Sequence, residues 1–224
     1  METQKVKDAF NQGSNKYDNY RKQAIPLMDE FYQTAIDLTK KYNNPKILDL
    51  GAGTGILTEL LHKQHPKSEI TLIDMSHKML EKARKKFENE ILFNYIEANY
   101  LTHNFPEQYD IIISSLSIHH LTDDEKQELY EKIYNHLLDG GVFINADQVS
   151  GATDKTEQLY KEKDESHLQT QNMPEYEKEI LRKRRTLDKP ATLRDTIKWY
   201  KQIGYVNVDV FFKYYRYFVI SGQK

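Results

Sequence analysis

The stretch that decides the fold is ILDLGAGTG at residues 47–55. It starts as a short apolar strand and runs directly into a turn in which Gly51, Gly53 and Gly55 alternate with small residues. Glycine permits a tight turn and lets a ligand approach the backbone, because no Cβ stands in the way. A helix after such a turn adds unpaired N–H groups and the positive end of its dipole. The stretch therefore predicts a ligand-binding turn between a buried strand and a helix.

Further apolar runs follow the glycine turn and repeat the pattern of a strand and then a helix. We expect parallel strands at residues 46–50, 69–74, 91–96, 109–115 and 141–146. Continuous apolar strands of this kind indicate a parallel sheet that helices cover on both faces. The alternation predicts an α/β fold with right-handed crossovers.

Capping residues and glycines predict where the helices begin and end. Thr122 with Glu125 makes a capping box, and Gly140 with Gly141 is expected to end that helix. A later helix starts at Thr192. Two strands over 205–212 and 214–220 then read as a hairpin, so the sheet should end with an antiparallel pair.

The 224 residues are expected to form one domain with four parts. Residues 1–42 form an N-terminal helical cap, and residues 43–150 form the binding core. Residues 151–190 are highly charged and lack a strand pattern, so we expect a helical lid there. Residues 191–224 supply the last helix and the hairpin.

The composition excludes several classes of protein. With 38% hydrophobic and 12% aromatic residues, the chain is not expected to be disordered. No apolar run approaches the roughly 20 residues that span a bilayer, and the polar first twenty residues lack a secretory core. The absence of cysteine excludes disulfides and thiolate metal ligands. A net charge of −2 does not indicate a nucleic-acid partner, so a cytoplasmic protein is expected.

Two acidic residues narrow the choice of ligand. Asp74 ends the second strand, where an acidic side chain accepts the two hydroxyls of a ribose. Asp49 lies so near the turn that it would repel a pyrophosphate, whereas it could meet a cationic amino group. The glycine spacing is G-x-G-x-G rather than G-x-G-x-x-G. S-adenosylmethionine, which carries an amino group and no phosphate, therefore fits better than NAD.

At this point the chain resembles the class I S-adenosylmethionine-dependent methyltransferases. Residues 47–55 are similar to the first motif of that family, and LIDMS at 72–76 is similar to the second. The resemblance covers about residues 45–147. It implies a Rossmann-like, doubly wound, seven-stranded sheet that is mostly parallel with an antiparallel C-terminal hairpin strand. It also implies S-adenosylmethionine as the cofactor and says little about the substrate.

The resemblance implies a set of cofactor-binding residues along the carboxyl ends of the strands. Asp74 would hold the ribose and Met75 would pack on the adenine. Where the family often has an aspartate, Asn99 offers a neutral and weaker acceptor for the adenine amino group. The whole set on these strands is Asp49, Gly51, Ala52, Gly53, Gly55, Asp74, Met75, Ala98, Asn99 and Ser115.

The N-terminal segment YDNYR at 17–21 resembles a Tyr-Asp-x-x-Arg segment that folds over the cofactor in similar methyltransferases. Arg21 could then pair with the methionine carboxylate, and Tyr17 could form a wall of the methyl site. The alternative, weighed equally, is that both are surface residues on a capping helix.

His119 and His120 follow the fourth strand and are, with Tyr17, the candidates for catalysis. One imidazole could be a general base, since an unperturbed pKa near ~6.5 suits proton removal at neutral pH. The alternative is that both histidines orient the loop. Asp147 with a histidine could bind a metal, but the spacing does not support this, so no metal site is expected.

We therefore expect methyl transfer from S-adenosylmethionine to a small-molecule acceptor by in-line displacement, without a membrane or nucleic-acid partner. One alternative is a tRNA-modifying enzyme that uses this cofactor or a derivative, for which the basic run 182–185 is the candidate contact. A second alternative is a non-catalytic, cofactor-binding regulatory protein. The sequence leaves the acceptor atom and a homodimer open.

Overall fold

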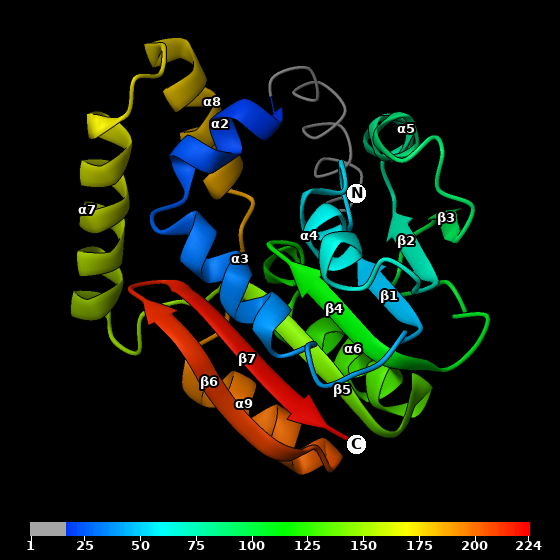
Figure 1. The fold of residues 1–224 in the computed structure, drawn as a ribbon. Helices are drawn as coiled ribbons and strands as arrows, with labels where there is room; N and C mark the ends of the chain where they lie inside the picture. The colour runs from blue at the N-terminus through cyan, green and yellow to red at the C-terminus, as the bar shows by residue number, and fades with distance from the viewer. Residues whose placement is uncertain (1–16) are drawn as a thin grey trace.

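The structure, a computed structural model, describes residues 17–224, with side chains from Tyr20 onward. Seven strands form one sheet in the order β3-β2-β1-β4-β5-β7-β6 (Figure 1). Strands β1 to β5 are parallel, and β7 runs antiparallel to both β5 and β6. This confirms the expected sheet and its antiparallel end. The bounds are β1 Ile47–Leu50, β2 Ile70–Asp74, β3 Phe93–Glu97, β4 Tyr109–Ser115, β5 Leu137–Gln148, β6 Val206–Tyr214 and β7 Tyr217–Gln223.

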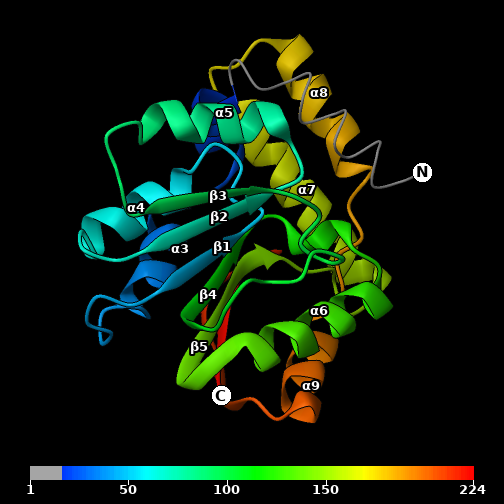
Figure 2. The ribbon, with the colours of Figure 1, turned by 90° about the vertical axis from the view of Figure 1, so that its right-hand side faces the viewer.

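Helices cover both faces of the sheet (Figure 2). One face carries α3 (Met28–Asp37), α4 (Ile56–Gln64) and α5 (His77–Lys86), and the other carries α6 (Asp123–His136) and α9 (Leu193–Ile203). No helix in residues 17–224 combines the length and apolar character needed to cross a membrane.

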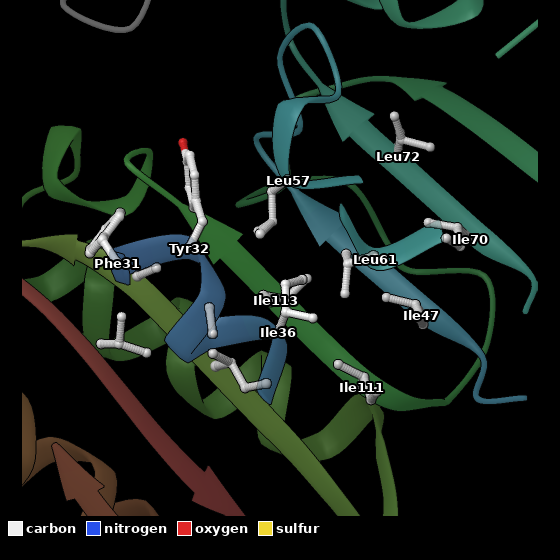
Figure 3. Packing of buried hydrophobic residues seen from close by; sticks show 14 of the residues in the cluster. Phe31, Tyr32, Ile36, Ile47, Leu57, Leu61, Ile70, Leu72, Ile111 and Ile113 are labelled. Atoms are coloured by element: carbon white, nitrogen blue, oxygen red, sulfur yellow. The ribbon is translucent and has the colours of Figure 1, made fainter. Parts of the chain in front are cut away.

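The alternation of side chains along the central strands builds a core on each face. In β1, Ile47 joins the core with α3 and α4, which Figure 3 shows, whereas Leu48 and Leu50 join the core with α6 and α9. All four residues of β1 are buried. This two-sided burial is the reason that the strand reads as a continuous apolar run.

Three further helices lie near the end of the sheet toward which the arrowheads of β1, β2 and β4 point (Figure 1). They are α2 (Tyr17–Ala24), α7 (Asp154–Thr170) and α8 (Glu175–Arg185). His167 of α7 contacts the Gln23 carbonyl oxygen of α2 at 2.9 Å. The short 3-10 turn η2 (Ile118–His120) follows β4 at this same end.

The predicted helix starts are confirmed by their hydrogen bonds. Thr122 accepts from the Glu125 backbone N–H, while the Glu125 side chain accepts from the Thr122 N–H, completing the capping box. Thr192 accepts from the Asp195 N–H at the start of α9. Gly204 ends α9 with a φ of 114°, a left-handed conformation that glycine adopts without strain.

The expected glycine stop after α6 is wrong. The helix ends at His136, and β5 begins with Leu137, four residues earlier than the predicted start at Gly141. Leu137 pairs with Tyr109 of β4, and the Gly140 N–H donates to the Lys224 carbonyl oxygen. These partners lie far away in the sequence, so the local glycine signal could not reveal them.

Candidate active site

The glycine turn lies between β1 and α4, and Gly53 and Gly55 have different structural roles in it. At Gly53 (φ +58°) the nearest atom to an added Cβ would be the Gly51 carbonyl oxygen at 4.0 Å, so the backbone is open to approach. At Gly55 (φ +78°) an added Cβ would lie 2.6 Å from the Phe87 ring. Gly53 therefore offers backbone to a ligand, whereas Gly55 lets α4 pack closely against the end of α5.

Asp74 is held at the end of β2 with its carboxylate next to the glycine turn. One oxygen accepts from the Gly53 N–H at 2.9 Å, and the other accepts from the Ser76 N–H at 2.8 Å. Each carboxylate oxygen can accept two hydrogen bonds. The carboxylate therefore lies beside the glycine turn, and its role as the ribose acceptor stays a prediction.

A cavity of about 240 Å³ opens beside this turn. Eight predicted site residues line it: Arg21, Gly51, Ala52, Gly53, Asp74, Met75, Ser115 and His120. They come from α2, the glycine turn, the ends of β2 and β4, and η2. The carboxyl ends of parallel strands are where open α/β sheets place their ligands.

Asp49 does not line this cavity among the described residues, although the sequence placed it at the cofactor. It is 1% exposed, and one carboxylate oxygen accepts from the Thr58 hydroxyl at 2.6 Å. Burial raises its pKa to about 7. The side chain ties the end of β1 to α4, because alternation along the strand turns it toward that helix.

Asn99 and Ala98 also fall outside the lining of the cavity within residues 17–224. The Asn99 side-chain oxygen accepts from the Leu101 N–H at 2.9 Å and so stabilises the turn after β3. An asparagine that bonds to the backbone two residues ahead is a common turn device. Local turn chemistry therefore engages this oxygen, and the predicted adenine contact stays a prediction.

Arg21 reaches the cavity from α2. Its Nε donates to the Tyr32 hydroxyl of α3 at 3.2 Å, and both residues line the cavity. This placement favours the cofactor-covering interpretation of Arg21 over a surface position. Tyr17 belongs to α2, but its side chain lies outside the described part of the structure, so its predicted role stays a prediction.

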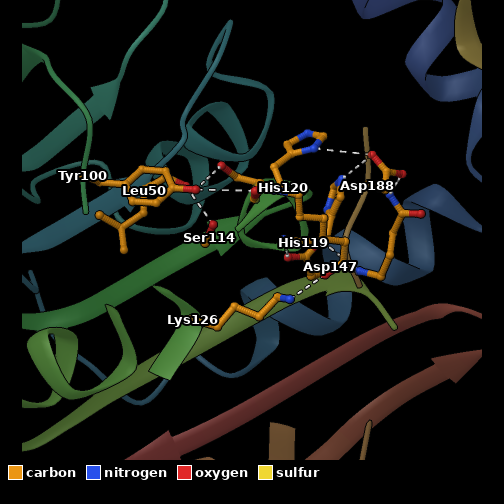
Figure 4. Close-up of polar contacts among 11 residues, drawn as sticks. Leu50, Tyr100, Ser114, His119, His120, Lys126, Asp147 and Asp188 are labelled. Carbon is orange, nitrogen blue, oxygen red and sulfur yellow. Dashed lines mark hydrogen bonds and ion pairs between the residues drawn. The ribbon is translucent and has the colours of Figure 1, made fainter. Parts of the chain in front are cut away.

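His120 faces the cavity and His119 does not, as judged on the described residues. His119 is 4% exposed, and its Nδ1 lies 2.5 Å from Oδ1 of Asp147 at the end of β5 (Figure 4). The His119 backbone N–H also donates to the second oxygen of Asp147 at 3.0 Å. His119 is thus fixed in the wall behind His120.

The electrostatics of the two imidazoles differ. Burial alone lowers the pKa of His119, but the carboxylates of Asp147 and Asp188 outweigh burial and raise the pKa to about 10. Burial and the neighbouring His119 charge lower the pKa of His120 to about 3. A general base works best with a pKa near the operating pH. Neither imidazole is therefore unperturbed. The shifts disfavour a general base and suit His120 to hydrogen bonding, while the catalytic role of either histidine stays a prediction.

The structure adds site residues that the sequence did not reveal. Tyr100 and Ser117 line the cavity, and the Tyr100 hydroxyl lies 3.1 Å from Ser117 Oγ. An added Cβ at Gly51 would lie 2.1 Å from that same Oγ, so the glycine turn packs directly on Ser117. Ser117 follows the end of β4 by two residues, and this position is the signal in the sequence that could have identified it.

The segment after α8 is the second addition, through Thr186, Leu187 and Lys189. The Lys189 N–H donates to the His119 carbonyl oxygen at 2.7 Å, and the buried Lys126 ammonium of α6 donates to the Lys189 carbonyl oxygen. The segment falls within the lid expected over 151–190, but the sequence singled out none of its residues, because their partners lie in η2 and α6.

Comparison with known proteins shows the family of the chain. A model of the methyltransferase domain family matches residues 47–141. An uncharacterized methyltransferase of Bacillus cereus is 30% identical over 175 residues, which are 75% of this chain and 80% of that protein. Malonyl-[acyl-carrier protein] O-methyltransferase 1 of Ilyobacter polytropus is 30% identical over 141 residues, 63% of this chain and 51% of its own length.

Other relatives match over most of their length. A carboxy-S-adenosyl-L-methionine synthase of Helicobacter hepaticus is 27% identical over 227 residues, covering 95% of this chain and 92% of that protein. By contrast, the chain spans about half the length of the malonyl-[acyl-carrier protein] O-methyltransferases of Ilyobacter polytropus.

A solved structure confirms the architecture. A putative O-methyltransferase of Nostoc punctiforme superimposes with a TM-score of 0.66 at 18% identity, covering 89% of this chain and 57% of that one. At this identity the likeness shows the fold alone, and the sequence relatives carry the assignment. With its glycine turn, an Asp74 carboxylate that accepts from Gly53, and these relatives, the chain belongs to the class I S-adenosylmethionine-dependent methyltransferases.

Proposed function

We propose that this chain catalyses methyl transfer from S-adenosylmethionine to a small-molecule acceptor. The observation that carries the proposal is that one cavity joins the glycine turn and Asp74 to the groups at the end of β4, such as His120. Cofactor-binding and acceptor-facing residues therefore share one space. S-adenosylmethionine supplies, when bound, a methyl group on a positively charged sulfur.

The residues present fit that cofactor. The open backbone at Gly53 and the neighbouring Asp74 carboxylate suit a ribose. Met75 lies beside Asp74 on the cavity wall, where its side chain suits an adenine face. Arg21 offers a cation to the methionine carboxylate.

In this proposal the rest of the chain acts by holding the acceptor in line. Displacement at a methyl group needs the attacking atom at a short distance and a fixed angle, and such positioning can supply much of the rate. Polar groups for this purpose come from His120, Thr122 and Lys189, which all line the cavity. Lys189 is distant from the other two in the sequence. The Lys126 anchor holds the segment of Lys189 in place.

A second candidate is chemistry on the cofactor itself. The near full-length match to a carboxy-S-adenosyl-L-methionine synthase favours it. The sequence also leaves open an enzyme that uses a derivative of S-adenosylmethionine. The basic run at residues 182–185 gives less support to the alternative of a tRNA-modifying enzyme. Arg182 is bonded to Glu165 at 2.7 Å and to Glu175 at 2.6 Å, so its charge is already paired within the lid.

The test combines cofactor binding with product analysis. Calorimetry should show binding of S-adenosylmethionine and S-adenosylhomocysteine and weaker or no binding of NAD. Mass spectrometry should then detect S-adenosylhomocysteine and a methylated product when pools of small-molecule acceptors are added. A cofactor that gains a carboxyl group would support the second candidate instead. Tighter binding of NAD, or binding of cofactor without turnover on any acceptor pool, would contradict the methyltransferase proposal.

A further inference from the structure

A cluster of metal-ligating side chains lies behind the cavity, where η2 meets the segment after α8. His119 Nε2 and His120 Nδ1 each lie 3.4 Å from the same oxygen, Asp188 Oδ1 (Figure 4). One ligand atom from each of the three residues falls within 4.8 Å of the others. Asp188 is 7% exposed in its side chain, so the cluster is largely removed from solvent.

The two distances fit shared ligation better than direct hydrogen bonding. Hydrogen bonds between charged nitrogen and oxygen are usually about 2.7–2.9 Å long. Ligand atoms placed about 2.0–2.1 Å from a zinc ion in a tetrahedron lie about 3.4 Å apart. Both 3.4 Å separations therefore correspond to edges of a metal coordination polyhedron.

Asp147 supplies the support that a metal-bound histidine normally has. It contacts His119 Nδ1 at 2.5 Å and accepts backbone N–H groups of His119 and Gln148. These bonds fix the ring, so that Nε2 is the nitrogen close to Asp188. A carboxylate behind a histidine is the usual arrangement at protein metal sites, because it fixes the ring and raises its basicity.

Gln148 completes the surroundings of the cluster. Its Nε2 lies 3.2 Å from His119 Nε2 and 3.4 Å from Asp188 Oδ2, while its Oε1 is buried with no hydrogen-bond partner among the described residues. The two ends of a side-chain amide are assigned from their partners rather than observed directly. With the amide turned over, Gln148 would present an oxygen ligand to the same point.

Charge also favours a cation. Two carboxylates, Asp147 and Asp188, and two imidazoles share a space from which water is nearly excluded. A divalent ion balances two carboxylates while both imidazoles remain neutral, and buried charges are stable when they are paired or coordinate a metal. Imidazole with carboxylate is a ligand set for first-row transition metals rather than for Mg²⁺ or Ca²⁺.

We propose that His119, His120 and Asp188 bind a divalent first-row transition metal ion such as Zn²⁺, with Asp147 orienting His119. No metal site is expected from the sequence, because the spacing of Asp147 and the histidines does not support one. Asp188 does not enter that expectation, since it lies in a distant segment. The ion would fasten the 186–190 segment, which lines the cavity, to η2 and β5. The site shares His120 with the proposed function, but metal binding is measured without cofactor or acceptor, so the two proposals can fail separately.

The test is metal binding by the full chain without cofactor. The chain is stripped with a chelator, and Zn²⁺ alone is titrated by calorimetry with a large excess of Mg²⁺ present. One Zn²⁺ per chain should bind. Asp188→Asn and His120→Gln should each weaken binding at least about 100-fold, and Asp147→Asn should weaken it about 10–100-fold. The matched control is His77→Gln, which removes an exposed histidine that lies 2.7 Å from Glu97 and should leave Zn²⁺ affinity unchanged.

Two further readouts cover variants that fail to fold. The unaltered chain loaded with Co²⁺ should show the strong visible absorption of a low-symmetry site of four or five ligands. Zn²⁺ should also slow amide exchange in residues 186–190. Absence of saturable Zn²⁺ binding would overturn the proposal, and His119 would then join the two carboxylates as an imidazolium. Binding that Asp188→Asn and His120→Gln leave unchanged, in folded variants, would overturn it as well.

Discussion

At the scale of single residues, Asp74 accepts from the glycine turn and lines the cavity, where we propose that it holds the ribose. We expect Asp74→Ala to weaken S-adenosylhomocysteine binding at least tenfold. Hydrogen bonds to a charged group contribute about 1.5–3 kcal/mol each, and about 1.4 kcal/mol corresponds to a factor of ten. Calorimetry with S-adenosylhomocysteine measures the effect, and the exposed Asp37→Ala serves as the control. An unchanged dissociation constant would remove Asp74 from the cofactor site.

Asp49 gives the chain a pH-dependent stability. Its pKa is about 7 in the folded state, against an ordinary value near ~3.9 in the unfolded chain. Between these values the folded state keeps a proton that the unfolded state releases, so this group lowers stability as pH rises, by at most about 1.4 kcal/mol per pH unit. Asp49→Asn keeps an acceptor for Thr58 and cannot ionise.

The Asp49→Asn variant should therefore gain stability relative to the parent chain on going from pH 5 to pH 8. Urea unfolding of both proteins at the two pH values measures the difference. For the control Asp139→Asn, at an exposed position, the difference in stability from the parent chain should be the same at both pH values. A pH-independent effect of Asp49→Asn would mean that Asp49 is ionised in its buried position.

The two adjacent histidines should respond differently to substitution. We expect His120→Asn to lower the single-turnover rate at least about tenfold while the affinity for cofactor stays unchanged, because His120 lines the cavity. His119→Asn should instead lower the melting temperature, because it takes the imidazole away from the buried Asp147. A rate unaffected by His120→Asn would show that this histidine is structural.

At the scale of elements, α7 is attached to the β6–β7 turn by a buried ion pair. Arg216 Nε lies 2.6 Å from Asp164 Oδ2, and the two side chains are 6% and 3% exposed. Removing one partner of such a pair costs about 3–5 kcal/mol, because the other charge stays buried. Arg185, at 3.9 Å, is a weaker partner for Asp164.

We expect Arg216→Met to destabilise the chain by about 3 kcal/mol in urea unfolding. The double variant Asp164→Leu with Arg216→Met should lose less, because neither charge of the buried pair is left alone. The flanking partners Arg185 and Glu157 are each 24% exposed in their side chains, so water can solvate them. The exposed pair of Lys40 and Asp37, 2.7 Å apart, is the control, since surface ion pairs contribute about 0–1 kcal/mol. Equal losses of stability in the single and double variants would contradict an ion pair of Arg216 and Asp164 that is buried away from water.

At the scale of the whole molecule, the lid packs less apolar surface than the sheet does. In α7 only Asp164 and Leu168 are buried, and in α8 only Lys178 is buried. Segments with few buried apolar contacts open more easily. We expect residues 151–185 to exchange amide hydrogens faster than β1 and β4.

Cofactor should slow exchange in the lid, because the 186–189 segment lines the cavity and connects to α8. Mass spectrometry with and without S-adenosylhomocysteine measures this, and α9, which lies on the opposite face from α4, is the internal control. Equal protection in both states would contradict a gating role. From the sequence we also expect fast exchange in residues 1–22, of which residues 1–16 lie outside the described part of the chain.

The sequence was informative wherever the physical cause is local. The caps at Thr122 and Thr192 are confirmed, because a hydroxyl three residues from an N–H needs no other part of the fold. The glycine turn and Asp74 also lie where predicted, since a strand, a turn and a second strand bring them together. Asn99 shows the limit of this reasoning, because a motif position cannot reveal that a nearby N–H already engages the side-chain oxygen.

The sequence by itself determined the parallel sheet, its antiparallel end and the place of the cofactor turn. Strands that are buried on both faces need continuous apolar runs, and the tight turn needs glycines, so both can be recognised from the order of residue types. Only the tertiary structure decided which histidine faces the cavity and that Asp188 joins both. Contacts between η2, β5 and the segment after α8 depend on how distant elements pack. The pKa values of Asp49, His119 and His120 follow from that packing, because burial and neighbouring charges set them.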